Sequence, residues 1–204
     1  MMLVSVSCSQ DSGQSTTVLS TIQIGTQVWT DKNLDLDHYR NGDLIPEVTD
    51  PTEWANVTTG AWCYYNNDPA NGPIFGKIYN WFALNDPRGL APAGFHIPSD
   101  AEWNTLTSYL GGDAVAGGKM KETGLLHWNS NVGATNSSGF TALPAGHRIS
   151  SGIFEGLGSF TIWSSKSEYN INYVWNRYVE EWSAVVERQN NLKWNGYSVR
   201  CVKN

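Results

Sequence analysis

The sequence predicts an α+β domain. Two segments have the apolar spacing of helices, and five short segments near the C-terminus have the length and turn boundaries of strands. The 204 residues suffice for one domain with a sizeable core, whereas two full domains would fit poorly. Ten Trp and 20 Gly favour an aromatic-rich, turn-rich fold over a helical bundle. We therefore expect residues 1–17 to form a tail and residues 18–204 to form the domain.

The first expected element of the domain is a β-hairpin. From Val18, apolar residues recur at alternate positions, first Ile22 and Ile24 and then Val28 and Trp29 beyond the turn Gly25-Thr26. This alternation predicts one buried face.

Residues 38–73 are rich in Gly, Pro, Asn, Asp and Thr and are predicted to be mostly irregular, with a short strand at 62–65. Residues 66–72 (NNDPANG) group oxygen ligands in a turn, as Ca²⁺ requires. They lack the later bidentate Glu of an EF-hand loop, and such clusters usually form turns alone. The sequence thus predicts no cofactor, with Ca²⁺ as the alternative at this turn.

Two helices are predicted in the middle of the chain. The first covers 74–84, where Ile78, Trp81 and Phe82 have helical spacing. The second begins after Ser99, which has the capping-box spacing to Glu102, and Gly111-Gly112 ends it. Its core-facing stripe consists of Trp103, Leu106 and Leu110.

Beyond Gly124, short segments alternate with Gly, Asn and Ser and predict a meander of strands. The predicted strands are 139–144, 160–164, 173–179, 184–188 and 197–202. Two helices among short strands predict an α+β fold in which the helices pack on mostly antiparallel strands with much irregular loop.

Charge and motifs exclude several functions. The net charge of −6 offers no attraction for a phosphate backbone, so nucleic acid is not an expected partner. The chain has no Gly-rich phosphate loop, G-x-S-x-G, H-E-x-x-H or C-x-x-C, and its four histidines share no close spacing. We therefore expect a protein that is not an enzyme and has no metal centre.

The N-terminal segment MMLVSVSCSQDSGQSTT suggests a membrane anchor. A short apolar patch reaches Cys8 and a Ser-, Gln- and Thr-rich tether follows, which resembles the end of a bacterial lipoprotein signal with Cys8 as the lipidated residue. No Lys or Arg precedes Cys8, and the alternative is a tail with an incidental cysteine. No apolar run approaches the ~20 residues that span a bilayer, so contact with a membrane is expected only through this anchor. Cys63 and Cys201 could pair in an exported protein, which the sequence leaves open.

Six ordered stretches resemble the Fibrobacter succinogenes major paralogous domain family, from about Ile22 to Lys203. They are IGTQVWTDKNLD (24–35), EVTDPTEWANVTTGAWCYYNND (47–68), GKIYNWFAL (76–84), GLAPAGFHIPSDAEWNTLTSYLGG (89–112), GATNSSGFTALPAGHR (133–148) and GYSVRCVK (196–203).

The resemblance implies a C-type-lectin-like fold related to formylglycine-generating enzymes. It also implies an exported protein of the cell surface or an outer-membrane lipoprotein, and some related proteins are varied near the C-terminus by diversity-generating retroelements. The family commonly has Cys where this chain has Ala91, so Cys201 is expected to be a buried free thiol or to pair with Cys63. Formylglycine-generating enzymes hold copper with two nearby C-terminal cysteines, and only Cys201 is present here, so the resemblance does not carry that activity over.

Residues 168–195 have the composition of a recognition surface, because Tyr and Trp give rigid contact area and Asn and Ser give adaptable hydrogen bonds. The candidates for an exposed ligand-binding face are Tyr169, Asn170, Asn172, Tyr173, Asn176, Tyr178, Glu180, Trp182, Asn190, Asn191 and Trp194. Trp175 is expected in the core, and half of the candidates would face the core if the strands alternate. The leading hypothesis is therefore a surface-displayed, adhesin-like module that binds protein or glycan. The alternatives are an enzyme on the same scaffold and a structural surface or fimbrial component.

Overall fold

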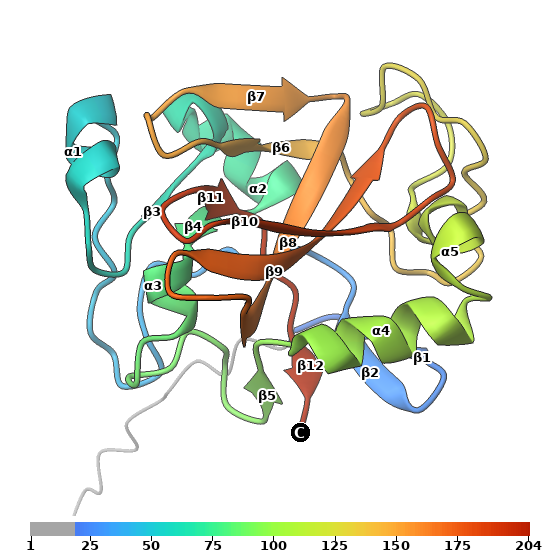
Figure 1. Ribbon diagram of the computed structural model, residues 1–204, viewed down its shortest axis with the longest axis horizontal. Coiled ribbons are helices and arrows are strands. Elements are labelled where there is room, and N and C mark those ends of the chain that lie inside the picture. Colours follow the sequence, from blue (N-terminus) through green and yellow to red (C-terminus); the bar gives the residue numbers. More distant parts are fainter. Residues whose placement is uncertain (1–18) are drawn as a thin grey trace, which may run out of the picture.

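The computed structural model describes residues 19–204, which form two β-sheets with helices around them (Figure 1). Cys8, the tether and Val18 lie outside the described residues. The smaller sheet has the order β1-β2-β12-β5. Its strands are β1 (Thr21–Ile24), β2 (Gln27–Thr30), β5 (Phe95–His96) and β12 (Val202–Lys203). The β1–β2 pairing confirms the predicted hairpin, and β12 brings the end of the chain beside it.

The larger sheet has the order β10-β9-β8-β6-β11-β4-β3, with β7 paired to β6. Its strands are β3 (Trp62–Cys63), β4 (Ile78–Asn80), β6 (Ala145–Arg148), β7 (Phe154–Leu157), β8 (Phe160–Glu168), β9 (Tyr173–Glu180), β10 (Glu187–Leu192) and β11 (Gly196–Tyr197). Among these named strands only the β6–β8 contact is parallel. The predicted short, mostly antiparallel strands are thus confirmed.

The helices complete an α+β architecture. They are α1 (Pro51–Asn56), α2 (Gly72–Phe75), α3 (Trp81–Leu84), α4 (Asp100–Tyr109) and α5 (Asp113–Met120), with 3-10 turns at Tyr65–Asn67 and Pro69–Asn71. Helix α4 is the one predicted from its capping box, and both of the box's hydrogen bonds form between Ser99 and Glu102. Helices α1 and α5 were not predicted.

The predicted helix over 74–84 is wrong. The segment instead contains the end of α2, strand β4 and the single turn α3. Gly76 takes a positive φ of 75° and ends α2. The side-chain oxygen of Asn80 then accepts from the backbone N–H groups of Ala61 and Ala83, at 3.0 and 3.1 Å, so it both joins the neighbouring segment and caps α3.

Some strand boundaries also differ from the prediction. Residues 139–144 form a loop before β6, the strand predicted at 184–188 begins only at Glu187, and the predicted strand 197–202 is divided between the two sheets. The division arises because β11 ends in the larger sheet and β12 begins in the smaller one, so residues 198–201 cross between them. Hydrogen bonds with Ile162 of β8 at one end and with Thr30 of β2 at the other fix this crossing.

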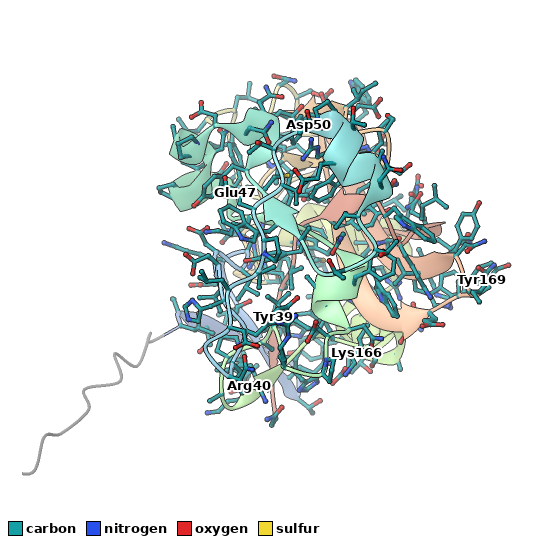
Figure 2. All side chains as sticks on the ribbon, turned by 90° about the vertical axis from the view of Figure 1, so that its left-hand side faces the viewer. Tyr39, Arg40, Glu47, Asp50, Lys166 and Tyr169 are labelled. Carbon is teal, nitrogen blue, oxygen red and sulfur yellow. The ribbon has the colours of Figure 1, made fainter. Side chains whose placement is uncertain are left out.

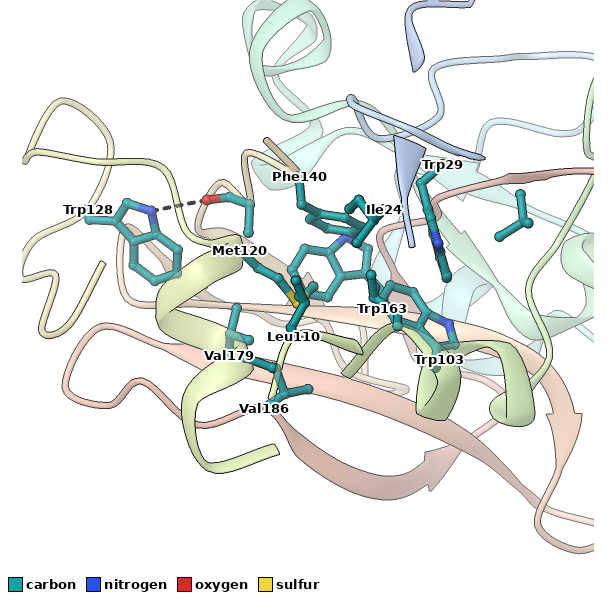
Figure 3. Close-up of a cluster of buried hydrophobic side chains, with 14 residues drawn as sticks. Ile24, Trp29, Trp103, Leu110, Met120, Trp128, Phe140, Trp163, Val179 and Val186 are labelled. Carbon is teal, nitrogen blue, oxygen red and sulfur yellow. Dashed lines mark hydrogen bonds between the residues drawn. The ribbon is translucent and has the colours of Figure 1, made fainter. Parts of the chain in front are cut away.

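Tryptophan dominates the largest core cluster, which α4, α5 and both sheets enclose (Figure 3). Trp103 of α4 lies 4.6 Å from Trp29 of β2 and 5.7 Å from Trp163 of β8, measured between ring centroids. Phe140 packs edge-on against Trp163. Trp103 and Leu106 are fully buried, as the predicted stripe requires. Aromatic rings therefore join the small sheet, α4 and the large sheet in one core.

Three buried cations hold the irregular loops through backbone carbonyls. Lys121 donates to the carbonyls of residues 132, 180 and 183 at 2.8–2.9 Å, and burial lowers its pKa to about 8. Arg148 donates to the carbonyls of residues 48, 49 and 152. Arg200 donates to three carbonyls and to the side chain of Asn33, and burial lowers its pKa to about 9. Each cation thus replaces the hydrogen bonds that regular structure would give these loops.

Cys63 and Cys201 are free and fully buried in separate core clusters, so the disulfide that the sequence left open does not form. Cys201 is the buried free thiol that the resemblance allowed. It shares its cluster with Ala91, the position where the resemblance led us to expect a cysteine.

Both thiols should resist modification in the folded protein. Burial raises the pKa of each to about 12, which lowers the thiolate fraction at pH 8 roughly a thousandfold, and the core also blocks access. In a Cys8→Ser variant, a disulfide reagent should label neither thiol without denaturant and both with it. Rapid native labelling of either thiol would contradict its placement in the core.

Within residues 19–204 no helix combines the length and the apolar character that crossing a bilayer would require.

Candidate functional site

The β8–β9 turn presents an aromatic and amide-rich tip to solvent. The side-chain oxygen of Asn170 accepts from the backbone N–H groups of Asn172 and Tyr173 at 2.9 and 3.0 Å, which fixes the turn. The exposed fractions are 51% for Tyr169, 82% for Ile171 and 36% for Tyr173. Tyr169 accordingly lies at the periphery of the molecule in Figure 2. Large apolar side chains are thus held outward on an ordered turn.

Trp175 continues this surface onto β9. Its ring lies 4.9 Å from that of Tyr169 in an edge-to-face arrangement, and the guanidinium of Arg188 stacks 3.4 Å from its centroid. Asn190 of β10 is directly opposite Trp175 and is exposed. We call residues 169–173 with Trp175, Arg188 and Asn190 the hairpin face.

An ion-pair network fixes the hairpin face to α4. Arg188 forms a bidentate pair with Asp100, at 3.0 and 2.8 Å, and the buried Arg177 donates to the same carboxylate at 2.8 Å. Burial opposes ionisation of Asp100, but its hydrogen bonds with Arg188 and Arg177 outweigh this and hold its carboxyl pKa below the usual value. Arg177 also donates to Asn104 at 2.6 Å. The cation over Trp175 is therefore held in place before any ligand arrives.

The hairpin face contains five of the predicted site residues, which are Tyr169, Asn170, Asn172, Tyr173 and Asn190. Another three, Tyr178, Glu180 and Asn191, lie on the opposite side of the β9–β10 ribbon. There the Tyr178 hydroxyl donates to Glu180 at 2.9 Å, and Asn191 donates to Gln189 at 3.5 Å. These polar groups thus bond mainly to one another.

The remaining three candidates are separate. Asn176 is fully buried, so its predicted exposure is wrong: its position alternates with Trp175 and places it on the same side as the buried Val174. Trp182 is exposed but follows the far end of β9. Trp194 is half-buried and packs edge-on against Phe82, with ring centroids 5.4 Å apart.

Trp175 was predicted in the core and is instead half-buried in the hairpin face. Ile171 and Arg188 were not predicted as site residues at all. Ile171 could have been found from its place at the centre of the polar turn 170–172, since an apolar residue there has no strand to face. Arg188 had no local signal, because its role depends on β10 pairing with β9.

Three polar side chains of the Asn66–Gly72 turn make hydrogen bonds within the protein, to the turn and to the segments beside it. The Asp68 carboxylate accepts from the backbone N–H of Ala70, and Asn67 and Asn71 donate to carbonyls. Residues 19–204 contain no group of three or more His, Cys, Asp or Glu side chains placed to hold a metal ion. The histidines His96, His127 and His147 each pair with one Glu.

One family model covers nearly all of the described residues. The sequence pattern of the Fibrobacter succinogenes major domain matches residues 22–203. The chain belongs to this family. The hairpin face and all strands after β1 fall inside the matched segment of the Fibrobacter succinogenes major domain. No curated protein and no solved structure matches the chain.

Proposed function

We propose that this Fibrobacter succinogenes major domain is a ligand-binding module displayed at the bacterial surface, and that the hairpin face binds an extracellular protein or glycan. The observation that carries the proposal is the exposure of Tyr169, Ile171 and Tyr173 on an ordered turn. Large apolar side chains that gather at one exposed place are typical of interaction sites.

Rigidity of the hairpin face also supports binding. Trp175 lies between the ring of Tyr169 and the guanidinium of Arg188, and Arg188 is fixed by Asp100. Aromatic side chains that are already ordered lose little entropy when they meet a ligand. The amides of Asn172 and Asn190 flank them and supply hydrogen bonds.

The family resemblance supplies the setting of the proposal. We propose on this basis that the α+β architecture is a C-type-lectin-like fold. Cys8 would carry a lipid that anchors the protein to the cell surface or outer membrane, and a retroelement would vary residues of the C-terminal face. A second set of candidates on the opposite side of the ribbon, including Tyr178 and Asn191, would extend the varied surface. The enzyme alternative would be favoured by Cys201 exposed in a pocket, whereas Cys201 is fully buried.

An array screen tests the proposal. The full chain with Cys8 replaced by serine is labelled and applied to a glycan array and to an array of purified extracellular proteins. We expect saturable binding to a small set of spots, and loss of those spots for a Tyr169→Ser/Tyr173→Ser variant with an unchanged melting temperature. Binding that this variant retains would place the ligand elsewhere and contradict the proposed face.

A further inference from the structure

A separate open cleft of about 270 Å³ lies beside α3. Three segments line it: residues 58–60, Trp81 and Phe82 at the start of α3, and residues 85–88. Its size is just below the range of sites that enclose drug-sized molecules. The cleft therefore suits a small ligand or one unit of a larger ligand.

Aromatic rings form one wall of the cleft. The half-buried Phe82 packs against Trp81 on one side and Trp194 on the other, with centroids 6.2 and 5.4 Å apart. The indole N–H of Trp81 is buried and has no hydrogen-bond partner among residues 19–204. The wall thus offers an apolar surface, and the buried indole N–H of Trp81 lies behind it.

The other walls offer neutral hydrogen-bonding groups. Thr58, Thr59 and Asn85 are exposed at the cleft. The two charged groups there neutralise each other, since Arg88 donates to Asp86 at 2.8 and 2.9 Å and this bond holds the pKa of the Asp86 carboxyl below its usual value. A neutral polar ligand therefore fits this cleft better than an ionic one.

From these groups we infer that the cleft binds one neutral pyranose unit. A pyranose has an apolar C–H face, which matches the ring of Phe82, and a rim of hydroxyls, which match Thr58, Thr59 and Asn85. The inference rests on the proposed function in one respect, namely that the displayed module meets glycans outside the cell.

The cleft and the hairpin face adjoin through one residue. The backbone N–H of Lys193 donates to Asn172 in the hairpin turn, and its carbonyl accepts from the N–H of Trp81, both at 3.0 Å. The Lys193 ammonium lies 4.2 Å from the Trp81 ring centroid and pairs with Glu168. Figure 1 shows the β8–β9 turn next to α3. A glycan chain seated in the cleft would consequently extend toward the hairpin face.

Indole NMR signals provide the test. The ¹⁵N-labelled full chain is titrated with the methyl β-glycosides of glucose, galactose, mannose and N-acetylglucosamine. We expect at least one glycoside to shift the indole signals of Trp81 and Trp194, with roughly millimolar affinity. Trp182 lies past the opposite end of β9, and its signal should not move.

Matched variants make the test specific to the cleft. Asn85→Ala should weaken the bound glycoside roughly threefold to tenfold, and Phe82→Leu should abolish the shifts while keeping apolar volume. Asn129→Ala removes an exposed amide beside the start of β8, outside both the cleft and the hairpin face, and should bind as the wild type does. If none of the four glycosides moves the Trp81 signal, or if Asn85→Ala binds as tightly as the wild type, the inference is wrong.

The outcome is independent of the array screen with the Tyr169→Ser/Tyr173→Ser variant. A loss of array binding by that variant, without any glycoside shift at Trp81, would overturn the cleft alone. Glycoside shifts at Trp81 in a protein whose array binding survives both tyrosine substitutions would overturn the hairpin face alone.

Discussion

Replacement of Arg200 by methionine is expected to lower the free energy of unfolding by about 3–5 kcal/mol. The side chain is almost completely buried, and its hydrogen bonds satisfy the carbonyls of Thr30, Phe140 and Thr141 and the side-chain oxygen of Asn33. Methionine fills much of the volume but donates to none of these acceptors. The three carbonyls would lose this donor in the interior, and the Asn33 oxygen would keep only its bond from the indole N–H of Trp163. These contacts also connect the residues between β11 and β12 to β2 and to the Phe140 loop.

Chemical denaturation measures this loss, with Arg88→Met as the matched control. Arg88 pairs with Asp86 and Asp43 at the surface, where such pairs contribute at most about 1 kcal/mol. A loss for Arg200→Met no larger than that for Arg88→Met would contradict the view that buried cations hold the irregular loops together.

Local signals in the sequence were sufficient to predict elements whose hydrogen bonds are local, such as the start of α4. Ser99 and Glu102 identify the start of α4 because both of their hydrogen bonds lie within one helical turn. The helix predicted over 74–84 failed for a non-local reason. The spacing of its apolar residues fits a helix, but the Asn80 side chain bonds to Ala61, which lies on another segment, and residues 78–80 pair with β3 and β11.

The composition of residues 168–195 pointed to the region of the candidate site, but it did not tell which of these residues face solvent and which face the core. Trp175 was predicted in the core from its mid-strand place between Tyr173 and Arg177, and Asn176 was predicted at the surface. In the structure Trp175 is half-buried in the hairpin face and Asn176 is fully buried. Alternation along β9 places Trp175 beside Arg188, whereas Asn176 shares the side of the buried Val174. Both sides of β9 carry aromatic and polar residues, so composition does not tell which alternate residues face the core. Only strand pairing and the packing around β9 decide this.

Loss of the two tyrosines at the hairpin tip is expected to weaken ligand binding roughly a hundredfold or more. Tyr169 and Tyr173 are exposed, so a Tyr169→Ser/Tyr173→Ser variant should change the free energy of unfolding by no more than about 1 kcal/mol. Since Tyr169 also packs against Trp175, its loss removes one of the contacts that order the central ring of the face. The effect should therefore fall on binding and leave folding almost intact.

The most direct test of the hairpin face is the Kd of the ligand that gives the strongest array signal, measured by biolayer interferometry. The wild type, the Tyr169→Ser/Tyr173→Ser variant and Trp182→Ser are compared at equal folded concentration. Trp182→Ser is the matched aromatic control, because Trp182 is 65% exposed but lies away from the face. We expect the double variant to lose at least about a hundredfold in affinity and Trp182→Ser to bind as the wild type does. Equal affinity of the double variant and the wild type would contradict the hairpin face as the binding site.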